Sequence, residues 1–234
     1  MCICLPRKIP TDCRVIDKIL EGGISSESVS LIYGEAETGK TVLAMQCAIN
    51  CARQGYKTLF VDCDGTFSAE RLSQIASKDF ERIAELIVLM RPSNFREQTL
   101  IIDQSGDYVN EHFGLLIFDT ITSLYRAEIA ESPSKAFALN RELNRQLASL
   151  AQIAKLSRIA VLVTSQVRTA FEEERVSVEP VAPRVLKFWA NTIIDLKPSE
   201  NPQVIKAILE KPKVQHPTCY LKIEKSGMLE HKSH

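Results

Sequence analysis

The strongest constraint on the fold of this chain is the stretch Gly34–Thr41, which reads GEAETGKT. It matches the pattern G-x-x-x-x-G-K-T, in which the two glycines let the backbone curve around a phosphate without a Cβ in the way. Successive backbone N–H groups then point at the phosphate oxygens. The predicted nucleotide-binding residues are Gly34, Glu35, Ala36, Glu37, Thr38, Gly39, Lys40 and Thr41.

The residues around this loop decide whether the match is meaningful, because a glycine-containing surface turn can imitate the pattern. Residues Val29–Tyr33 before the loop read as a buried strand, and Thr41–Gln54 after it carry apolar residues at near-helical spacing. A strand, a loop and a helix in this order favour a phosphate site. Lys40 would then neutralise the β- and γ-phosphates, and the Thr41 hydroxyl would ligate Mg²⁺.

The rest of the chain alternates apolar strands with helical segments. The expected strands after the loop are Thr58–Cys63, Glu85–Met90, Leu115–Asp119, Ile159–Thr164, Thr192–Leu196, Val204–Leu209 and Cys219–Ile223. Alternation of this kind predicts an α/β fold with a mainly parallel central sheet and helices on both faces. The last, proline-punctuated strands predict an antiparallel C-terminal edge. We expect one domain over residues 1–234, with an irregular lead-in over 1–11 and a long charged loop over 168–183.

Composition limits the classes of function. The 234 residues carry no formal net charge, so any binding to DNA needs a local basic patch. No apolar run is long enough for a transmembrane helix, and the N-terminus is too short in apolar length for a signal peptide. The odd number of cysteines, seven, favours free thiols. We therefore expect a cytoplasmic protein that does not enter a membrane.

Three polar residues follow predicted strands, at the edge of the sheet where ligands of α/β proteins bind. Asp119, after four apolar residues, has the position of a carboxylate that holds Mg²⁺ opposite Thr41. Asp64 is placed to polarise the water that attacks the terminal phosphate. Gln166 is placed to sense that phosphate, although a strand-end amide that bonds only to backbone is the alternative.

These motifs together resemble the RecA-type recombinase family. The resemblance is carried, in order, by Gly22–Ile24, the phosphate loop, Val61–Phe67 with Glu70–Leu72, Leu115–Asp119 and Val163–Val167. It covers nearly the whole chain and is strongest toward the archaeal RadA and eukaryotic strand-exchange proteins. Within that group the chain resembles the short archaeal paralogues of RadA, which have no N-terminal helix-hairpin-helix domain.

The resemblance implies a RecA-like P-loop ATPase core that binds ATP and Mg²⁺ and acts in homologous recombination and DNA repair. By family pattern, Arg71 lies against adenine, and residues 125–135 and 168–183 form two DNA-binding loops. The basic residues implied in DNA contact are Arg126, Arg168, Arg175, Arg184 and Lys187. Residues 210–213 would approach ATP on a neighbouring subunit.

Three departures from the family pattern modify these expectations. Asp64 stands where active recombinases carry glutamate, one methylene longer, which predicts slow hydrolysis. None of the nine phenylalanines has alanine three residues later, so the Phe-x-x-Ala hook of recombinase filaments is missing. The second DNA loop is acidic: its glutamates outnumber its arginines, and they repel a phosphate backbone.

The resulting expectation is an accessory recombination protein with weak ATPase activity, DNA-dependent or DNA-independent. It would bind DNA, single-stranded in preference and in a salt-dependent manner, and would modulate a RadA-type recombinase or a Holliday-junction nuclease without exchanging strands. Two alternatives stay open: a catalytic strand-exchange recombinase, and a KaiC-like signalling ATPase that does not bind DNA.

Overall fold

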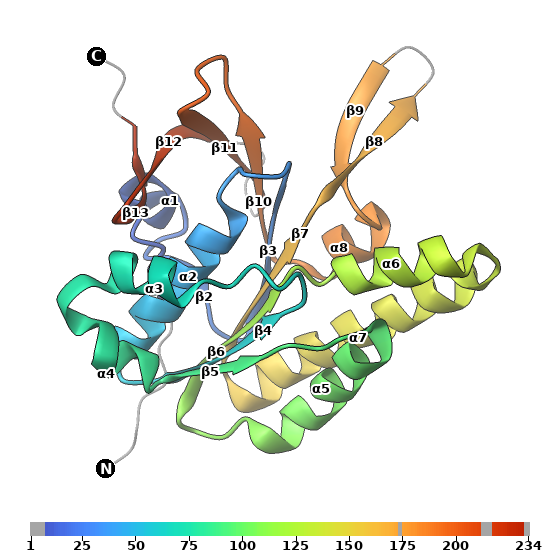
Figure 1. Cartoon of the computed structure of the whole chain (residues 1–234), viewed down its shortest axis with the longest axis horizontal. Helices are drawn as coiled ribbons and strands as arrows, with labels where there is room; N and C mark the ends of the chain where they lie inside the picture. The colour runs from blue at the N-terminus through green and yellow to red at the C-terminus, as the bar shows by residue number, and fades with distance from the viewer. Residues whose placement is uncertain (1–7, 173–174, 212–216, 232–234) are drawn as a thin grey trace.

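A nine-stranded sheet forms the centre of the molecule (Figure 1). The computed structural model of the chain describes residues 8–172, 175–211 and 217–231. The sheet has the strand order β13-β12-β11-β10-β3-β7-β6-β4-β5. Neighbours from β10 to β5 pair in parallel, whereas β10 to β13 pair antiparallel. The predictions of a mainly parallel sheet and an antiparallel C-terminal edge are confirmed.

The parallel strands are buried on both faces, which explains their continuous apolar runs. Every residue from Leu115 to Phe118 has no exposed surface. The parallel strands are β3 (Ser28–Gly34), β4 (Lys57–Asp62), β5 (Ile87–Met90), β6 (Phe113–Asp119), β7 (Ala160–Ser165) and β10 (Thr192–Pro198). The antiparallel strands are β11 (Val204–Lys211), β12 (Thr218–Glu224) and β13 (Gly227–Glu230).

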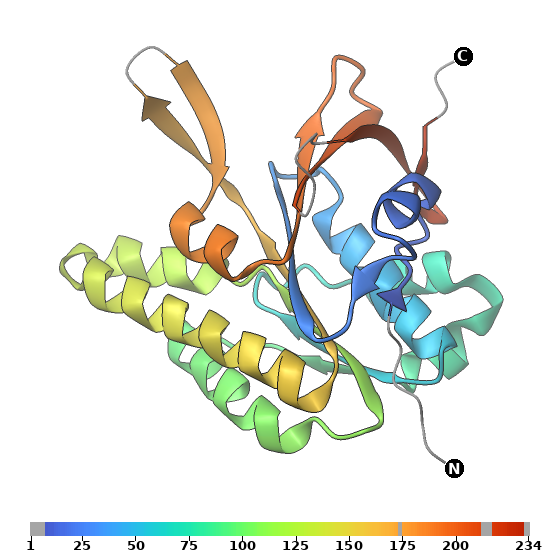
Figure 2. The same ribbon diagram turned by 180° about the vertical axis from the view of Figure 1, so that it is seen from behind.

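Helices cover the two faces of the sheet and form a separate apolar core on each (Figure 2). One core contains residues of α1 (Arg14–Ile19), α2 (Lys40–Arg53), α3 (Ala69–Ala76) and α4 (Phe80–Ala84). The other contains residues of α5 (Phe95–Tyr108), α6 (Ser123–Glu131), α7 (Ala136–Ser157) and α8 (Pro183–Trp189). Short 3₁₀ turns, Ser77–Asp79 and Pro133–Lys135, precede α4 and α7. No helix in the described part of the chain is long and apolar enough to cross a membrane.

The predicted charged loop over residues 168–183 is wrong. Most of this segment is an antiparallel hairpin of β8 (Val167–Glu172) and β9 (Arg175–Pro180), which rises away from the sheet, and α8 begins at Pro183 (Figure 1). Its register sets Arg168 opposite Glu179 and Glu172 opposite Arg175. The opposite charges of Arg168 and Glu179, which lie 3.8 Å apart, stabilise the base of this ribbon. The alternation of Val176 and Val178 with polar residues in β9 was the available strand signal.

The predicted irregular lead-in also needs a correction at its end. Lys8–Ile9 form strand β1, which pairs antiparallel with β2 (Ile24–Ser25). Ile9 is completely buried, and Lys8 Nζ donates to the carbonyl oxygen of Leu20 at 2.8 Å. The paired partner lies beyond α1, and therefore a local reading of the sequence does not find this strand. Residues 1–7 lie outside the described part.

Candidate functional site

The phosphate loop connects β3 to α2, as predicted, at the carboxyl edge of the parallel strands. Both glycines of the motif are required by their surroundings. A Cβ on Gly34 would lie 2.2 Å from the carbonyl oxygen of Leu196 in β10. Gly39 has a φ of +86°, and a Cβ there would lie 2.2 Å from Met228 Cε. The loop is thus held between β10 and the β12–β13 hairpin.

Lys40 points back into the loop that precedes it. Its Nζ donates to the carbonyl oxygens of Gly34 at 3.0 Å and Glu35 at 2.6 Å. Burial lowers the pKa of Lys40, and the negative charges of Asp119, Asp64 and Glu35 partly offset this effect. A cationic amine therefore lies beside the loop and near two carboxylates, where it can neutralise a phosphate.

Asp119 ends β6 as a completely buried carboxylate. One oxygen, Oδ1, accepts a hydrogen bond from the Thr164 hydroxyl. The other, Oδ2, has no hydrogen-bond partner among the described residues. Burial raises the pKa of Asp119, against the lowering effect of the hydroxyls of Thr164 and Thr41. A free carboxylate oxygen beside the Thr41 hydroxyl is a donor set that suits Mg²⁺, which prefers hard oxygen ligands and completes its shell with phosphate oxygens and water.

Asp64 and Gln166 come together at the neighbouring strand ends. Asp64 Oδ2 accepts from the Thr120 hydroxyl at 3.0 Å and from Gln166 Nε2 at 3.5 Å. The other end of the Gln166 amide, Oε1, accepts from Arg126 Nη1 at 2.6 Å. Hydrogen bonds therefore connect the predicted catalytic carboxylate to an arginine of α6.

Arg71, in the first turn of α3, reaches the turn between β12 and β13. Its guanidinium donates to the carbonyl oxygens of Glu224 at 2.5 Å and Lys225 at 3.0 Å. The same hairpin supplies Met228 and Ile223, which pack at Gly39. The structure thus places Arg71 on the hairpin that covers the phosphate loop.

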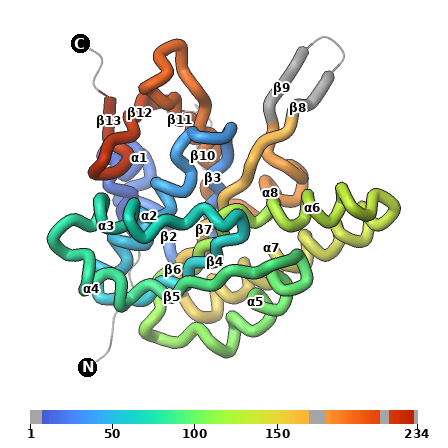
Figure 3. The backbone as a smooth tube through the Cα atoms, in the orientation of Figure 1, coloured from blue at the N-terminus to red at the C-terminus, as the bar shows by residue number. Residues whose placement is uncertain are grey.

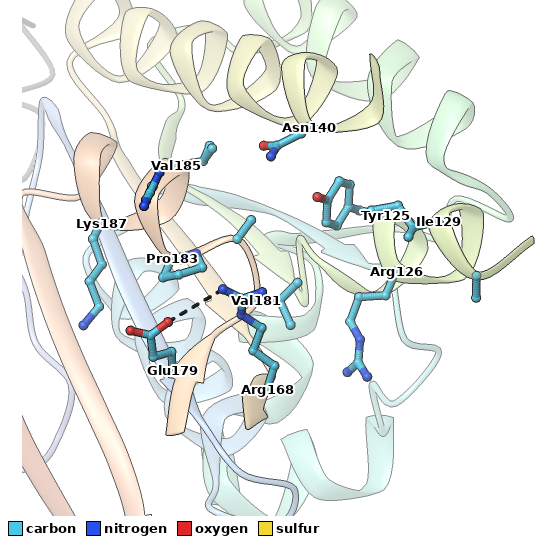
Figure 4. Close-up of a pocket in the computed structure, with 13 residues that line it drawn as sticks. Tyr125, Arg126, Ile129, Asn140, Arg168, Glu179, Val181, Pro183, Val185 and Lys187 are labelled. Atoms are coloured by element: carbon cyan, nitrogen blue, oxygen red, sulfur yellow. Dashed lines mark ion pairs between the residues drawn. The ribbon is translucent and has the colours of Figure 1, made fainter. Parts of the chain in front are cut away.

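A cleft of about 1040 Å³ opens between α6, α7, α8 and the base of the β8–β9 hairpin (Figure 4). It is lined by Arg126, Arg168, Arg184 and Lys187, which are four of the five basic residues predicted to contact DNA. The single carboxylate in its lining, Glu179, pairs with Arg168 at 3.8 Å. The cleft is therefore basic although the whole chain is neutral. Figure 3 shows α6 and α8 beside the base of β8.

Several other residues that were predicted to contact DNA or ATP are not placed in this cleft by the described structure. Residues 125–135 are not a loop: α6 and a 3₁₀ turn account for most of them. Arg175 is on β9, but its side chain lies outside the described part. Lys211 Nζ donates to the carbonyl oxygens of Lys187 and Ala190, at 2.7 and 3.3 Å, within its own chain. Residues 212 and 213 are not described.

Several residues of the site were not predicted. The Thr120 hydroxyl donates to Asp64, and the Thr164 hydroxyl donates to Asp119. Both threonines lie at the carboxyl end of a strand, and that position was the sequence signal that could have identified them. Tyr33, immediately before the phosphate loop, donates to Glu210 Oε1 at 2.7 Å, and Lys187 Nζ lies 2.8 Å from Glu210 Oε2. Three distant elements meet in this contact, and no sequence pattern predicts it.

The fold and the phosphate loop together define a P-loop protein with a RecA-like sheet. The family model described as Rad51 matches residues 7–231. The RadB crystal structure superimposes with a TM-score of 0.81 at 30% identity and covers 96% of this chain and 100% of its own.

Curated relatives agree with this classification. The DNA repair and recombination protein RadB of Methanosphaera stadtmanae is 32% identical over 218 residues, 92% of each chain. That of Methanococcoides burtonii is 31% identical over 225 residues, 96% of this chain and 98% of its own. The chain therefore belongs to the Rad51 family and, within it, to the RadB group. The resemblance to short archaeal RadA paralogues is confirmed.

Proposed function

We propose that this protein binds Mg²⁺·ATP and DNA and acts as an accessory factor in recombinational DNA repair. Its RadB relatives are named DNA repair and recombination proteins, and membership of the Rad51 family implies nucleotide binding. The observation that carries the proposal is the juxtaposition of two sites, the phosphate loop with its carboxylates and the basic cleft, joined through Gln166.

ATP would bind with its phosphates on the backbone amides of residues 34–41 and on Lys40. Thr41 and the free oxygen of Asp119 would hold Mg²⁺, which neutralises phosphate charge during phosphoryl transfer. The close packing of the β12–β13 hairpin at Gly39, with Arg71 bonded to its turn, supports a base-binding role for Arg71 at this end of the loop.

Hydrolysis would be slow. Asp64 would polarise the attacking water, but its carboxylate is bonded to the Thr120 hydroxyl and is one methylene shorter than glutamate. A displacement of about 1 Å from the reacting atoms can reduce a rate by roughly 10²-fold. ATP would then act mainly as a ligand that sets conformation.

DNA would lie across the basic cleft. Arg126, Arg168 and Arg184 would provide phosphate contacts that do not read sequence. The fourth cation of the lining, Lys187, is paired with Glu210 at 2.8 Å. Glu179 is paired with Arg168, which reduces its repulsion of a phosphate backbone. A RadA-type recombinase and a Holliday-junction nuclease are the partner classes we propose for the DNA-bound protein, with no strand exchange by the protein alone.

Calorimetric titration of Mg²⁺·ATP into wild type, Lys40→Ala and the exposed control Lys78→Ala tests the nucleotide site. Wild type and Lys78→Ala should bind, whereas Lys40→Ala should lose most of its affinity. A phosphate-release assay on Asp64→Glu should show a faster rate than wild type. Equal binding by Lys40→Ala would refute the site, and an unchanged or slower rate for Asp64→Glu would refute the assignment of Asp64.

A further inference from the structure

An ion pair lies at the start of the turn that carries Asp64. Asp62, the last residue of β4, is buried, and Arg91 directly follows the last residue of β5. The register of these strands sets Val61 opposite Met90, and so the residues that follow them are neighbours at the strand ends. Arg91 Nε donates to Asp62 Oδ2 at 3.0 Å. A hydrogen bond between charged groups is roughly twice as strong as a neutral one, and this one joins the ends of two strands.

The Asp62 carboxylate also binds the far end of the turn. Its Oδ1 accepts from Thr66 N at 3.0 Å, and its Oδ2 accepts from Phe67 N at 3.2 Å. Arg91 reaches the same end, because its Nη2 donates to the carbonyl oxygen of Phe67 at 3.1 Å. One guanidinium therefore binds both ends of the turn over residues 62–67.

Asp64 lies in the middle of this turn, between two anchored ends. The start of the turn is fixed by Cys63 N, which donates to the carbonyl oxygen of Asp119 at 2.8 Å. The middle is open: Gly65 is exposed, has a φ of +69°, and would have nothing within 4 Å of an added Cβ. The backbone at Asp64 is thus placed by the two ends of the turn, and Arg91 ties them together.

We propose that Arg91 is a positioning residue for ATP hydrolysis. Its bonds to Asp62 and to the Phe67 carbonyl would keep the turn closed. The closed turn would hold the Asp64 carboxylate where it polarises the attacking water. Arg91 would act through the turn and not on ATP, so it would set the rate of hydrolysis and leave the affinity for nucleotide unchanged. The inference rests on the proposed role of Asp64.

The test compares the rate of hydrolysis with the affinity for nucleotide. Single-turnover hydrolysis of radiolabelled Mg²⁺·ATP by excess protein gives the rate, and calorimetric titration of a non-hydrolysable analogue gives the affinity. Arg91→Gln should lower the rate by roughly 10-fold to 10²-fold, as a small displacement of a catalytic group does, and keep the wild-type affinity. The control Arg82→Gln removes the same charge from α4, where Arg82 pairs with Asp79 at 3.9 Å, and should keep the wild-type rate.

Three further measurements separate positioning from a general loss of structure. In an Asp64→Ala background, Arg91→Gln should have no additional effect on the rate, because residues that act through one another are not additive. Arg91→Lys keeps the charge beside Asp62 but has no planar fork for a second acceptor, so it should also slow hydrolysis. Amide hydrogen exchange over residues 62–67 should be faster in Arg91→Gln than in wild type, and exchange over α2 should be unchanged.

The outcomes distinguish this inference from the function on which it rests. A wild-type rate in Arg91→Gln or Arg91→Lys, loss of analogue binding by Arg91→Gln, a further loss of rate in the Asp64→Ala background, or wild-type exchange over residues 62–67 would overturn the role of Arg91 alone. Wild type that binds the analogue but hydrolyses ATP no faster than Asp64→Ala refutes the role of Asp64 and the inference with it. Wild type that does not bind the analogue refutes the proposed function itself.

Discussion

Substitution of Gly39 by alanine tests the packing of the phosphate loop under the β12–β13 hairpin. Gly39 has a φ of +86°, and an added Cβ would lie 2.2 Å from Met228 Cε and 2.9 Å from Ile223 Cδ1. Gly55 offers a matched control, because it has a φ of +87° and nothing within 4 Å of an added Cβ. Both variants carry the same backbone strain, and only Gly39→Ala adds a clash with side chains of the hairpin.

The expected losses in unfolding free energy follow from the backbone strain and from the clash with the hairpin side chains. An L-residue in the left-handed region costs about 1–2 kcal/mol, which applies to both variants. Overpacking against the completely buried Met228 adds about 1–3 kcal/mol for Gly39→Ala alone. For a chain of 234 residues, 1 kcal/mol corresponds to about 2–4 °C in Tm. Gly39→Ala should therefore melt at least ~2 °C below Gly55→Ala.

Thermal unfolding of both variants, with and without Mg²⁺·ATP analogue, measures the difference. Gly55→Ala should keep the ligand-induced rise in Tm, and Gly39→Ala should lose most of it because its loop amides no longer converge on a phosphate. Truncation of the clashing side chain in Gly39→Ala/Met228→Ala should recover part of the unfolding free energy. Equal Tm values for Gly39→Ala and Gly55→Ala would refute this packing argument.

Three other predictions follow from individual contacts. Thr164→Val removes the hydrogen-bond donor to Asp119 and should raise the Mg²⁺ concentration needed for nucleotide binding by roughly 10–100-fold. The control Ser30→Ala removes a buried hydroxyl with no partner among the described residues and should leave that concentration unchanged; equal Mg²⁺ titrations of the two variants would contradict this. Burial raises the pKa of Asp195, so the charge of this carboxylate destabilises the fold above that pKa. Asp195→Asn should therefore be more stable than wild type at pH 8 and lose this advantage as the pH falls toward ~4. Urea unfolding that shows the opposite trend would refute this prediction. Electron microscopy with ATP and single-stranded DNA should show no long regular filaments, and extended filaments would overturn the inference drawn from the missing hook.

The sequence predicted the strand, loop and helix around Gly34–Thr41 because their geometry is local. Gly34, Lys40 and Thr41 lie within one loop, and a strand and a helix around that loop can be recognised from neighbouring residues. The position of Asp119 at a strand end was predictable for a related reason, since four apolar residues followed by a carboxylate mark the end of a buried parallel strand. The carboxyl ends of the parallel strands lie at one edge of the sheet, and the residues that follow them lie close together there.

The cleft and its supporting contacts depend on tertiary structure. β9 alternates polar residues with Val176 and Val178, which is a strand signal in the sequence, but its pairing with β8, which brings Arg168 opposite Glu179, depends on the fold. The bond between Arg126 and Gln166 joins residues 40 positions apart, and that between Tyr33 and Glu210 joins residues 177 apart. Charge counts along the sequence therefore suggested an acidic loop, whereas the folded chain gathers the basic side chains on one surface.

The central claim, that a neutral chain binds DNA through this cleft, is tested most directly by salt titration of oligo(dT) binding. The logarithm of wild-type affinity should fall linearly with the logarithm of salt concentration. In Arg168→Gln and Arg184→Gln each slope should be shallower by about 0.7, the value for one lost single-strand phosphate contact. Absent binding, or wild-type affinity and slope in both variants, would contradict the claim.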